Sequence, residues 1–182
     1  MMRILFFLTL LLSFSHCTGD RAPVATEEMT PQFFDLATYV DAEVTRLTDR
    51  GVRAEKTITL NGITETQPDR AINYETDLRL FREADINKPA WADKYTASSE
   101  ELSGNHRTTI YRALDSSLVV RRLLVEEDQG EVVRIEIDRK TGTVLSDGRH
   151  RLLYQPARGY SVTTRQTNRF GEDVEGEVRV SW

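Results

Sequence analysis

The C-terminal stretch Leu118–Trp182 alternates between β-prone runs and short turns, and this pattern limits the chain to few folds. Residues 133–138 show it most clearly, because Val133, Ile135 and Ile137 alternate with charged residues. A period of two places the apolar side chains on one side of a strand and the charged ones on the other. Connections of only a few residues make neighbours in sequence neighbours in space, so we expect an antiparallel meander.

Turn-forming residues divide this stretch into strands. Gly130 and Gly142 each end a run of such residues and can adopt a positive φ. The second run, 139–142, predicts a turn, and Asp147-Gly148 predicts a bulge or tight bend. The expected strands are Leu118–Glu127, a central strand around 133–138, Thr143–Asp147, Arg149–Tyr154, Tyr160–Arg165 and Val174–Trp182.

An amphipathic helix is expected between Thr30 and Gly51, well before the meander. Thr30 as N-cap and Pro31 at the first helical position would begin it, and Gly51 would end it. Apolar residues recur at every third or fourth position and form one stripe. The stripe would pack on the sheet, or alternatively on a membrane surface or a partner. The predicted polar side consists of Asp41, Glu43, Arg46 and Asp49.

Between the helix and the meander, Asn61-Gly62 within the β-prone segment 56–67 predicts a hairpin. Pro68-Asp69 is expected to end its second strand, because proline removes a hydrogen-bond donor. Residues 98–105 are rich in polar and turn-forming types and are expected to form a loop, with a strand following at 108–114.

The spacing of Tyr74, Leu78 and Phe81 predicts a second, shorter helix that ends near Ala84. The expected fold class is therefore α+β. An N-terminal helix and a short second helix would pack on a curved antiparallel β-sheet of six to eight strands, forming a half-barrel or an open meander.

Residues 1–16 predict a secretory signal peptide. Arg3 precedes the apolar run Ile4–Leu12, and small polar residues follow. The run is shorter than the ~20 residues that span a bilayer, which argues against the alternative of a membrane-anchor helix.

Cys17 is the only cysteine of the chain, so it has no partner for an internal disulfide. Residues 14–17, Phe-Ser-His-Cys, resemble a lipobox, the site where bacterial lipoproteins are cleaved before a lipid-modified cysteine. This resemblance implies a fatty-acylated Cys17, such as one bearing palmitate, and a membrane anchor. Residues 17–30 would form the lipidated tether and 31–182 a single α+β domain; the alternative is an unmodified N-terminus cut nearby.

The charge of the chain bears on its partners and compartment. It is −5 at pH 7, and removal of residues 1–16, whose only charged residue is Arg3, leaves −6. An acidic chain with both signs dispersed argues against nucleic acid as a partner. Thr18 follows the cysteine at the position where an aspartate would resemble the retention signal of inner-membrane lipoproteins. The expected location is therefore the cell envelope, anchored by lipid to the outer membrane, with its periplasmic face favoured.

Two segments of the chain resemble a known group of proteins. These are Thr59–Thr66, with the sequence Thr-Leu-Asn-Gly-Ile-Thr-Glu-Thr, and Asp85–Trp91, with the sequence Asp-Ile-Asn-Lys-Pro-Ala-Trp. Together with the two helices they look like a family of uncharacterised Bacteroidota outer-membrane or periplasmic lipoproteins. The resemblance implies a compartment and no mechanism. The expected shape is also loosely similar to that of half-barrel lipoprotein carriers.

Catalytic signals are absent from the sequence, and no enzymatic activity, cofactor or metal is expected. His106 and His150, the histidines after the signal, lie outside any nucleophile–base motif. Close-spaced metal ligands and a phosphate-binding glycine loop are missing. The acidic pairs Glu126-Glu127 and Glu172-Asp173 fall in predicted turns, where solvated charge is the ordinary role.

Two features give a weak indication of ligand binding. Arginines are dense in the C-terminal half, among them Arg149 and Arg151, and could bind an anionic group. The alternative is that they pair with acidic residues across strands. Trp91 beside Pro89 could line a pocket, or alternatively fill the core where a loop meets the sheet.

The expected function is that of a non-enzymatic cell-envelope lipoprotein which binds an apolar or amphiphilic ligand on the concave sheet. The alternative is an envelope interaction or scaffold protein that docks a larger complex through the sheet edge or the arginines. An enzyme is a third and weaker hypothesis, because no site residues were found for it.

Overall fold

The computed structural model describes residues 31–102 and 104–182. The predicted signal peptide 1–16, the lipidation site Cys17 and the tether 17–30 lie outside the described residues. Residues Pro31–Trp182 form one compact unit, and everything below refers to it.

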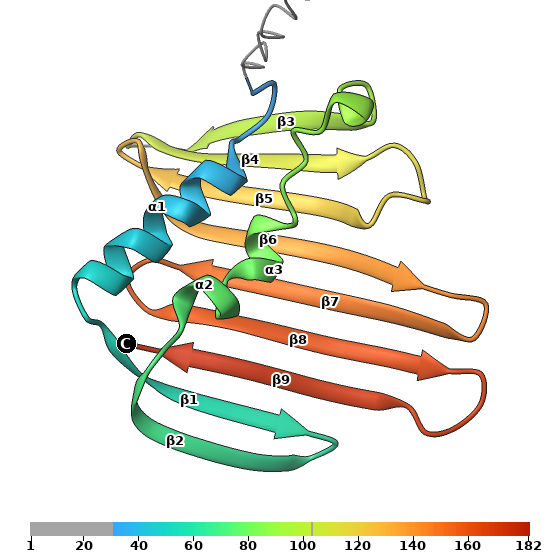
Figure 1. Cartoon of the computed structure of the whole chain (residues 1–182). Coiled ribbons are helices and arrows are strands. Elements are labelled where there is room, and N and C mark those ends of the chain that lie inside the picture. The colour runs from blue at the N-terminus through green and yellow to red at the C-terminus, as the bar shows by residue number, and fades with distance from the viewer. Residues whose placement is uncertain (1–30, 103) are drawn as a thin grey trace, which may run out of the picture. The chain divides into compact units, whose positions relative to one another are not determined.

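A nine-stranded sheet makes up most of this unit (Figure 1). All neighbouring strands are antiparallel, and the sheet does not close, since β2 and β3 are at opposite edges in the order β2-β1-β9-β8-β7-β6-β5-β4-β3. The strands are β1 (Arg53–Leu60), β2 (Ile63–Ala71), β3 (Tyr95–Leu102), β4 (His106–Ala113), β5 (Val120–Asp128), β6 (Glu131–Gly142), β7 (Ser146–Gln155), β8 (Gly159–Asn168) and β9 (Val174–Ser181).

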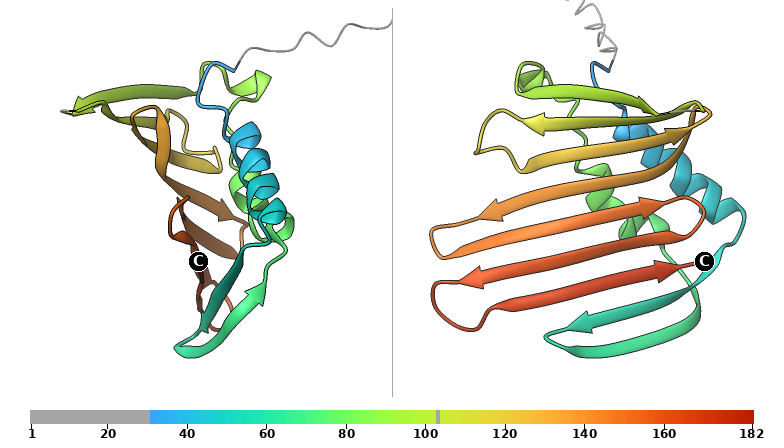
Figure 2. Two further views of the ribbon diagram at one scale, coloured as in Figure 1. Left: turned by 90° about the vertical axis from the view of Figure 1, so that its left-hand side faces the viewer. Right: turned by 180° about the vertical axis from the view of Figure 1, so that it is seen from behind.

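Three short helices and one long one pack on a single side of the sheet (Figures 1 and 2). We call this the helix side and the opposite one the open side. The helices are α1 (Leu36–Asp49), α2 (Tyr74–Asp77), α3 (Arg79–Arg82) and the 3-10 helix η1 (Pro89–Trp91). The architecture is thus α+β but mostly β. No helix among the described residues has both the length and the apolar character needed to cross a membrane.

The core lies between α1–α3 and the helix side. Alternation along each strand directs every second side chain toward the helices. Leu123 on β5, Ile137 on β6 and Leu152 on β7 are all fully buried there against the helices' Leu36 and Phe81. Register confirms this arrangement, because Leu123 lies opposite Ile137, which in turn lies opposite Leu152.

α1 begins later than the sequence predicts. Asp35, and not Thr30, is the N-cap, and its carboxylate accepts a hydrogen bond of 3.0 Å from the Thr38 backbone amide. The residues before it are held in non-helical positions by Asn87, whose side chain accepts from the Phe33 amide at 2.9 Å. The predicted end is confirmed, since Gly51 follows α1 with a φ of 58°.

Three strand predictions were wrong at their boundaries. β2 continues past Pro68 to Ala71, because β2 is an edge strand on which a missing donor is tolerated. Residues 98–102 belong to β3 and not to a loop, since main-chain pairing with β4 holds them despite their polar side chains. The predicted turn 139–142 is the end of β6, and β7 runs through Asp147-Gly148 as one strand.

The N-terminal hairpin β1–β2 joins the meander through β9, the last strand of the chain (Figure 1). Ile58 lies directly opposite Val178 in this pairing. Among the strand pairings of the described sheet it is the only one between strands that are not consecutive in sequence, and the pattern of residues did not predict it.

Candidate functional site

The residues suggested for ligand binding lie in two separate places. Arg149 and Arg151 are on β7 and point to the open side, because the alternate residue Leu152 is buried under the helices. Trp91 lies in η1 beside β3, where its ring packs against Tyr95 at 6.2 Å and partly fills the core. The structure therefore groups the two arginines and separates them from Trp91.

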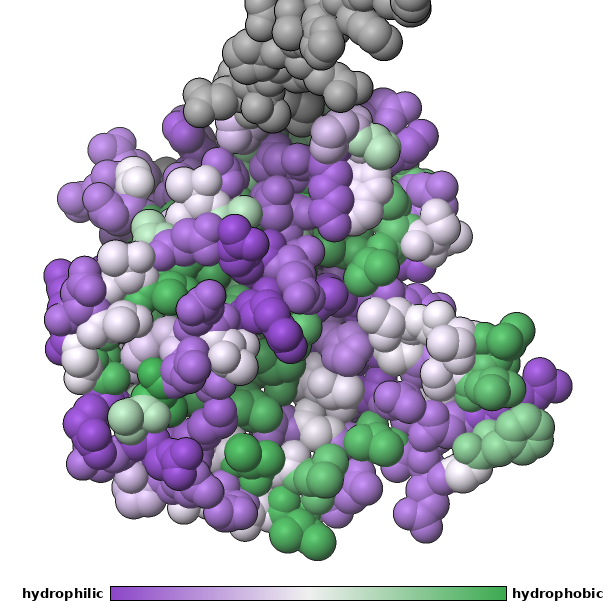
Figure 3. All heavy atoms as spheres, viewed as in Figure 1, coloured by the Kyte–Doolittle hydropathy of each residue, from purple (hydrophilic) through white to green (hydrophobic). Residues whose placement is uncertain are grey.

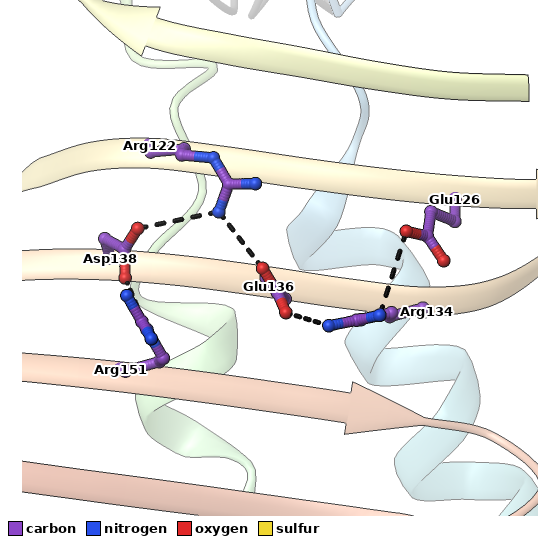
Figure 4. Close-up of polar contacts among 6 residues, drawn as sticks. All are labelled: Arg122, Glu126, Arg134, Glu136, Asp138 and Arg151. Atoms are coloured by element: carbon purple, nitrogen blue, oxygen red, sulfur yellow. Dashed lines mark hydrogen bonds and ion pairs between the residues drawn. The ribbon is translucent and has the colours of Figure 1, made fainter.

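A network of ion pairs covers the centre of the open side (Figure 4). Arg122 lies 3.1 Å from a Glu136 carboxylate oxygen and 3.5 Å from one of Asp138. Burial opposes ionisation of Glu136, but hydrogen bonds from Arg122 and Arg134 outweigh it, so the pKa of Glu136 is below its usual value. These arginines pair with acidic residues across strands. The network comprises Arg122, Glu126, Arg134, Glu136, Asp138 and Arg151.

A depression of about 630 Å³ adjoins this network. Its cationic lining includes Arg121, Lys140, Arg149, Arg151 and Arg165, which come from four neighbouring strands. Asp138 is the acidic residue of the lining, and Arg151 contacts it at 3.0 Å. Cations thus outnumber acids around the depression, in contrast to the balanced network beside it.

Two carboxylates connect the helices to the sheet. Glu43 of α1 accepts a hydrogen bond from the Tyr154 hydroxyl of β7 and forms two bonds of 2.7 Å with Arg46. Asp77 of α2 accepts from the Tyr160 hydroxyl of β8 at 2.5 Å. Burial and the facing carboxylates raise the pKa of both tyrosines, which therefore remain neutral donors.

Placing Glu43 on the polar side of α1 was an incorrect prediction, since it is only 8% exposed. Its spacing from Val40 and Leu47 could have shown this, because positions three and four apart share one stripe of a helix. Burial opposes its ionisation, but hydrogen bonds from Arg46 and Tyr154 outweigh it and lower the pKa of Glu43. The buried carboxylate is thus satisfied and holds α1 in place.

Exposed apolar side chains gather at one end of the sheet. In an antiparallel meander, the β1–β2, β4–β5, β6–β7 and β8–β9 connections all lie at the same end, which we call the apolar end. Of the eight large apolar side chains exposed among the described residues, only Val133 lies toward the other end. The other seven are Ile58, Leu60, Ile63, Leu114, Val144, Leu145 and Phe170.

Part of this apolar surface continues along the helix side. Val162 of β8 lies opposite Val178 of β9, which lies opposite Ile58 of β1. Leu60 then lies opposite Ile63 of β2, which is 79% exposed. We call these five residues the apolar strip. In Figure 3 apolar surface is visible over the β1–β2 end and over the β6–β7 and β8–β9 loops, beyond α1–α3.

The histidines do not form a recognisable catalytic arrangement. His150 lies between the hydroxyls of Thr141 and Thr164, at 3.2 and 3.1 Å, and burial lowers its pKa. His106 lines a shallow depression of about 470 Å³ with Glu101 and Glu127. Within the described residues His106 has no side-chain hydrogen bond to either acid. No group of three or more potential metal ligands occurs in this part of the chain.

Comparison with known proteins adds no assignment. No protein-family model matches the chain significantly, and neither does a curated protein or a solved structure. The function is therefore inferred from geometry and sequence.

Proposed function

We propose that this protein is a non-enzymatic cell-envelope lipoprotein that binds an amphiphilic molecule along the apolar strip. The observation that supports the proposal is the collection of seven exposed apolar side chains at one end of the sheet. Soluble monomers rarely expose large contiguous apolar patches without a binding role. Curvature of the sheet around its ligand, as in a half-barrel, is part of the same proposal.

The strip has the polarity expected for an amphiphile. Ile58, Leu60 and Val178 would contact an acyl chain, for which each buried methylene contributes about 0.8 kcal/mol. Two residues inward from Ile58, Lys56 lies on the same side of β1 and contacts Asp77 at 2.6 Å. A ligand chain on the strip would thus have an ion pair near one end and solvent at the other.

The envelope location rests on the sequence. We propose that Cys17 is acylated, that the mature protein is tethered to the outer membrane on its periplasmic face, and that it belongs to the Bacteroidota lipoprotein group its segments resemble. Intact mass of membrane-extracted protein tests the anchor. An added mass of acyl chains on a chain starting at Cys17 is expected, and an unmodified Cys17 would contradict it.

Ligand binding is tested with the purified full chain and a fluorescent long-chain fatty acid. The double variant Leu60→Ser/Ile63→Ser should bind at least about tenfold more weakly, equivalent to 1.4 kcal/mol. Val133→Ser is the matched control, since Val133 is exposed on β6 away from the strip, and its affinity should be unchanged. Absence of binding by the wild type, or equal binding by the double variant, would refute the proposal.

The alternative function is docking of a larger envelope complex. It is supported by the open edge at β3, where Thr96–Glu101 are exposed and the outer main chain is available for strand addition among the described residues. Cross-linking in cells should then capture a defined partner at β3. Loss of that cross-link on Ser99→Pro, which removes a donor from the outer edge because the alternate residues 94, 96 and 98 bond to β4, would support this function over the first.

A further inference from the structure

Three cations lie in one row across the open side of the sheet. Lys140 of β6 is directly opposite Arg149 of β7, and Arg149 is directly opposite Arg165 of β8. We call these residues the cationic row. Like charges placed directly opposite each other across strands are destabilising. The row therefore conflicts with the otherwise balanced pairing of this side.

Neighbouring acids relieve the row only in part. Asp147 lies 2.8 Å from the Lys140 ammonium and 3.6 Å from Arg149, and the hydrogen bond from Lys140 is the main reason why its pKa is lowered. Glu175 ends the row on β9, 3.0 Å from Arg165. Two carboxylates are thus shared among three cations, and every one of these side chains is accessible to solvent.

The residues beside the row increase the positive charge. Arg121 donates hydrogen bonds to the carbonyl oxygens of Asp115 and Ser116, which carry no charge, and the nearby Asp115 carboxylate offsets its positive charge only at longer range. Arg151 is paired with Asp138. Six arginine and lysine residues line the depression, of which Arg139 directs its guanidinium to the Leu80 carbonyl oxygen on the helix side. The other five and their ion-pair partners Asp138, Asp147 and Glu175 leave a local charge of +2 in a chain of net charge −5.

We propose that the cationic row and Arg121 form a binding site for a phosphorylated ligand with two linked phosphate groups. Arginine forms bidentate, charge-assisted hydrogen bonds with phosphate. Adjacent strands are about 4.8 Å apart, so cations from three strands span about 10 Å, a width that suits a diphosphate better than a single phosphate. The depression of about 630 Å³ accommodates a ligand of this size.

This site is distinct from the apolar strip. The row lies on the open side, whereas the strip lies on the helix side, so each can be removed while the other is retained. The diphosphate could belong to a soluble compound or to the headgroup of a membrane lipid. Both sources present the same chemistry to the row.

Binding is tested by calorimetry of the full chain with inorganic pyrophosphate and with orthophosphate. We expect pyrophosphate to bind at least about tenfold more tightly, and its affinity to fall as sodium chloride is raised. The double variant Arg149→Gln/Arg165→Gln should bind pyrophosphate at least tenfold more weakly. Arg179→Gln is the matched control, because Arg179 is exposed on the open side of β9 but outside the depression.

Vesicles distinguish the two sources of diphosphate. Vesicles of phosphatidylcholine containing a diphosphate-bearing lipid are compared with phosphatidylcholine alone, for both the wild type and the double variant. Binding of the wild type to the former identifies a headgroup site, and binding of pyrophosphate only identifies a soluble ligand. No binding of either, or equal binding by the double variant, would overturn the proposal, and circular dichroism of each variant confirms that it is folded.

Discussion

The two sides of the sheet are built from the same strands but differ in what covers them. On the helix side, α1–α3 bury an apolar core and two carboxylates bond to sheet tyrosines. On the open side, the alternate residues form ion pairs in contact with solvent. The comparison indicates that stability resides on the helix side, so that the open side can include charges unfavourable for folding.

Among the substitutions that test this comparison, Phe81→Ala should cause the largest change in the free energy of unfolding. Phe81 is fully buried and contacts the rings of Tyr154 and Tyr160 edge to face, so we expect the free energy of unfolding to fall by about 3–5 kcal/mol. Arg151→Ala on the open side should cost below about 1 kcal/mol, as exposed ion pairs do. Urea denaturation measures both, and equal losses would contradict the proposed division.

Glu43→Ala should have the next largest effect. It would leave the Tyr154 hydroxyl and Arg46 without their buried partner, at a cost of about 1–3 kcal/mol. Asp41→Ala is the control on the same helix, because its ion pair with Arg82 is exposed, and it should cost less than about 1 kcal/mol. A loss for Glu43→Ala no greater than for Asp41→Ala would show that the contact is not a structural connection.

Acid should weaken the helix side through the same residue. The pKa of Glu43 is lower in the folded chain than in the unfolded one, so its contribution to stability is complete above the unfolded value of about 4.3. That contribution is lost as pH falls through the folded value. Thermal denaturation from pH 6 to pH 3 should show a smaller decrease in Tm for Glu43→Gln than for the wild type. Identical pH profiles would be inconsistent with this assignment.

The smallest change is expected for Arg149→Thr, which should increase the free energy of unfolding instead of lowering it. Arg149→Thr removes a cation that faces two others, so without ligand it should raise the stability by a few tenths of a kcal/mol, up to about 0.5. Arg151→Thr, one row away on β7, removes a favourable pair with Asp138 and should lower it slightly. Denaturation in low salt checks the signs, and destabilisation by both changes would remove the evidence for unfavourable charge at the row.

The fold was predictable where local pattern and tertiary packing agree. Alternation along 133–138 correctly placed β6 in a meander, and Asn61-Gly62 correctly placed the β1–β2 turn. Residues 98–102 were missed because main-chain pairing at a sheet edge requires no apolar side chains. The β1–β9 pairing was missed because no local signal specifies which distant strand is the partner.

The candidate sites were predictable only by residue type. The density of arginines suggested anion binding, but register alone showed that Lys140, Arg149 and Arg165 lie side by side. Trp91 was suggested separately, as the lining of a pocket or as part of the core, and in the structure its ring packs against Tyr95 and partly fills the core. The apolar strip was not identified, because Ile58 and Leu60 are typical of a buried strand and their exposure depends on how far the helices extend over the sheet.

The β1–β9 pairing has a consequence for the order of folding. Val178 is 120 positions after Ile58, so β1 cannot pair with β9 until nearly all of the 182 residues have been synthesised. Closing so long a loop is entropically costly and slow compared with forming adjacent hairpins. The β3–β9 meander can therefore assemble first, while the outer edge of β1 in the N-terminal hairpin remains unpaired. Until β9 arrives, this hairpin is the segment that a chaperone would have most reason to protect.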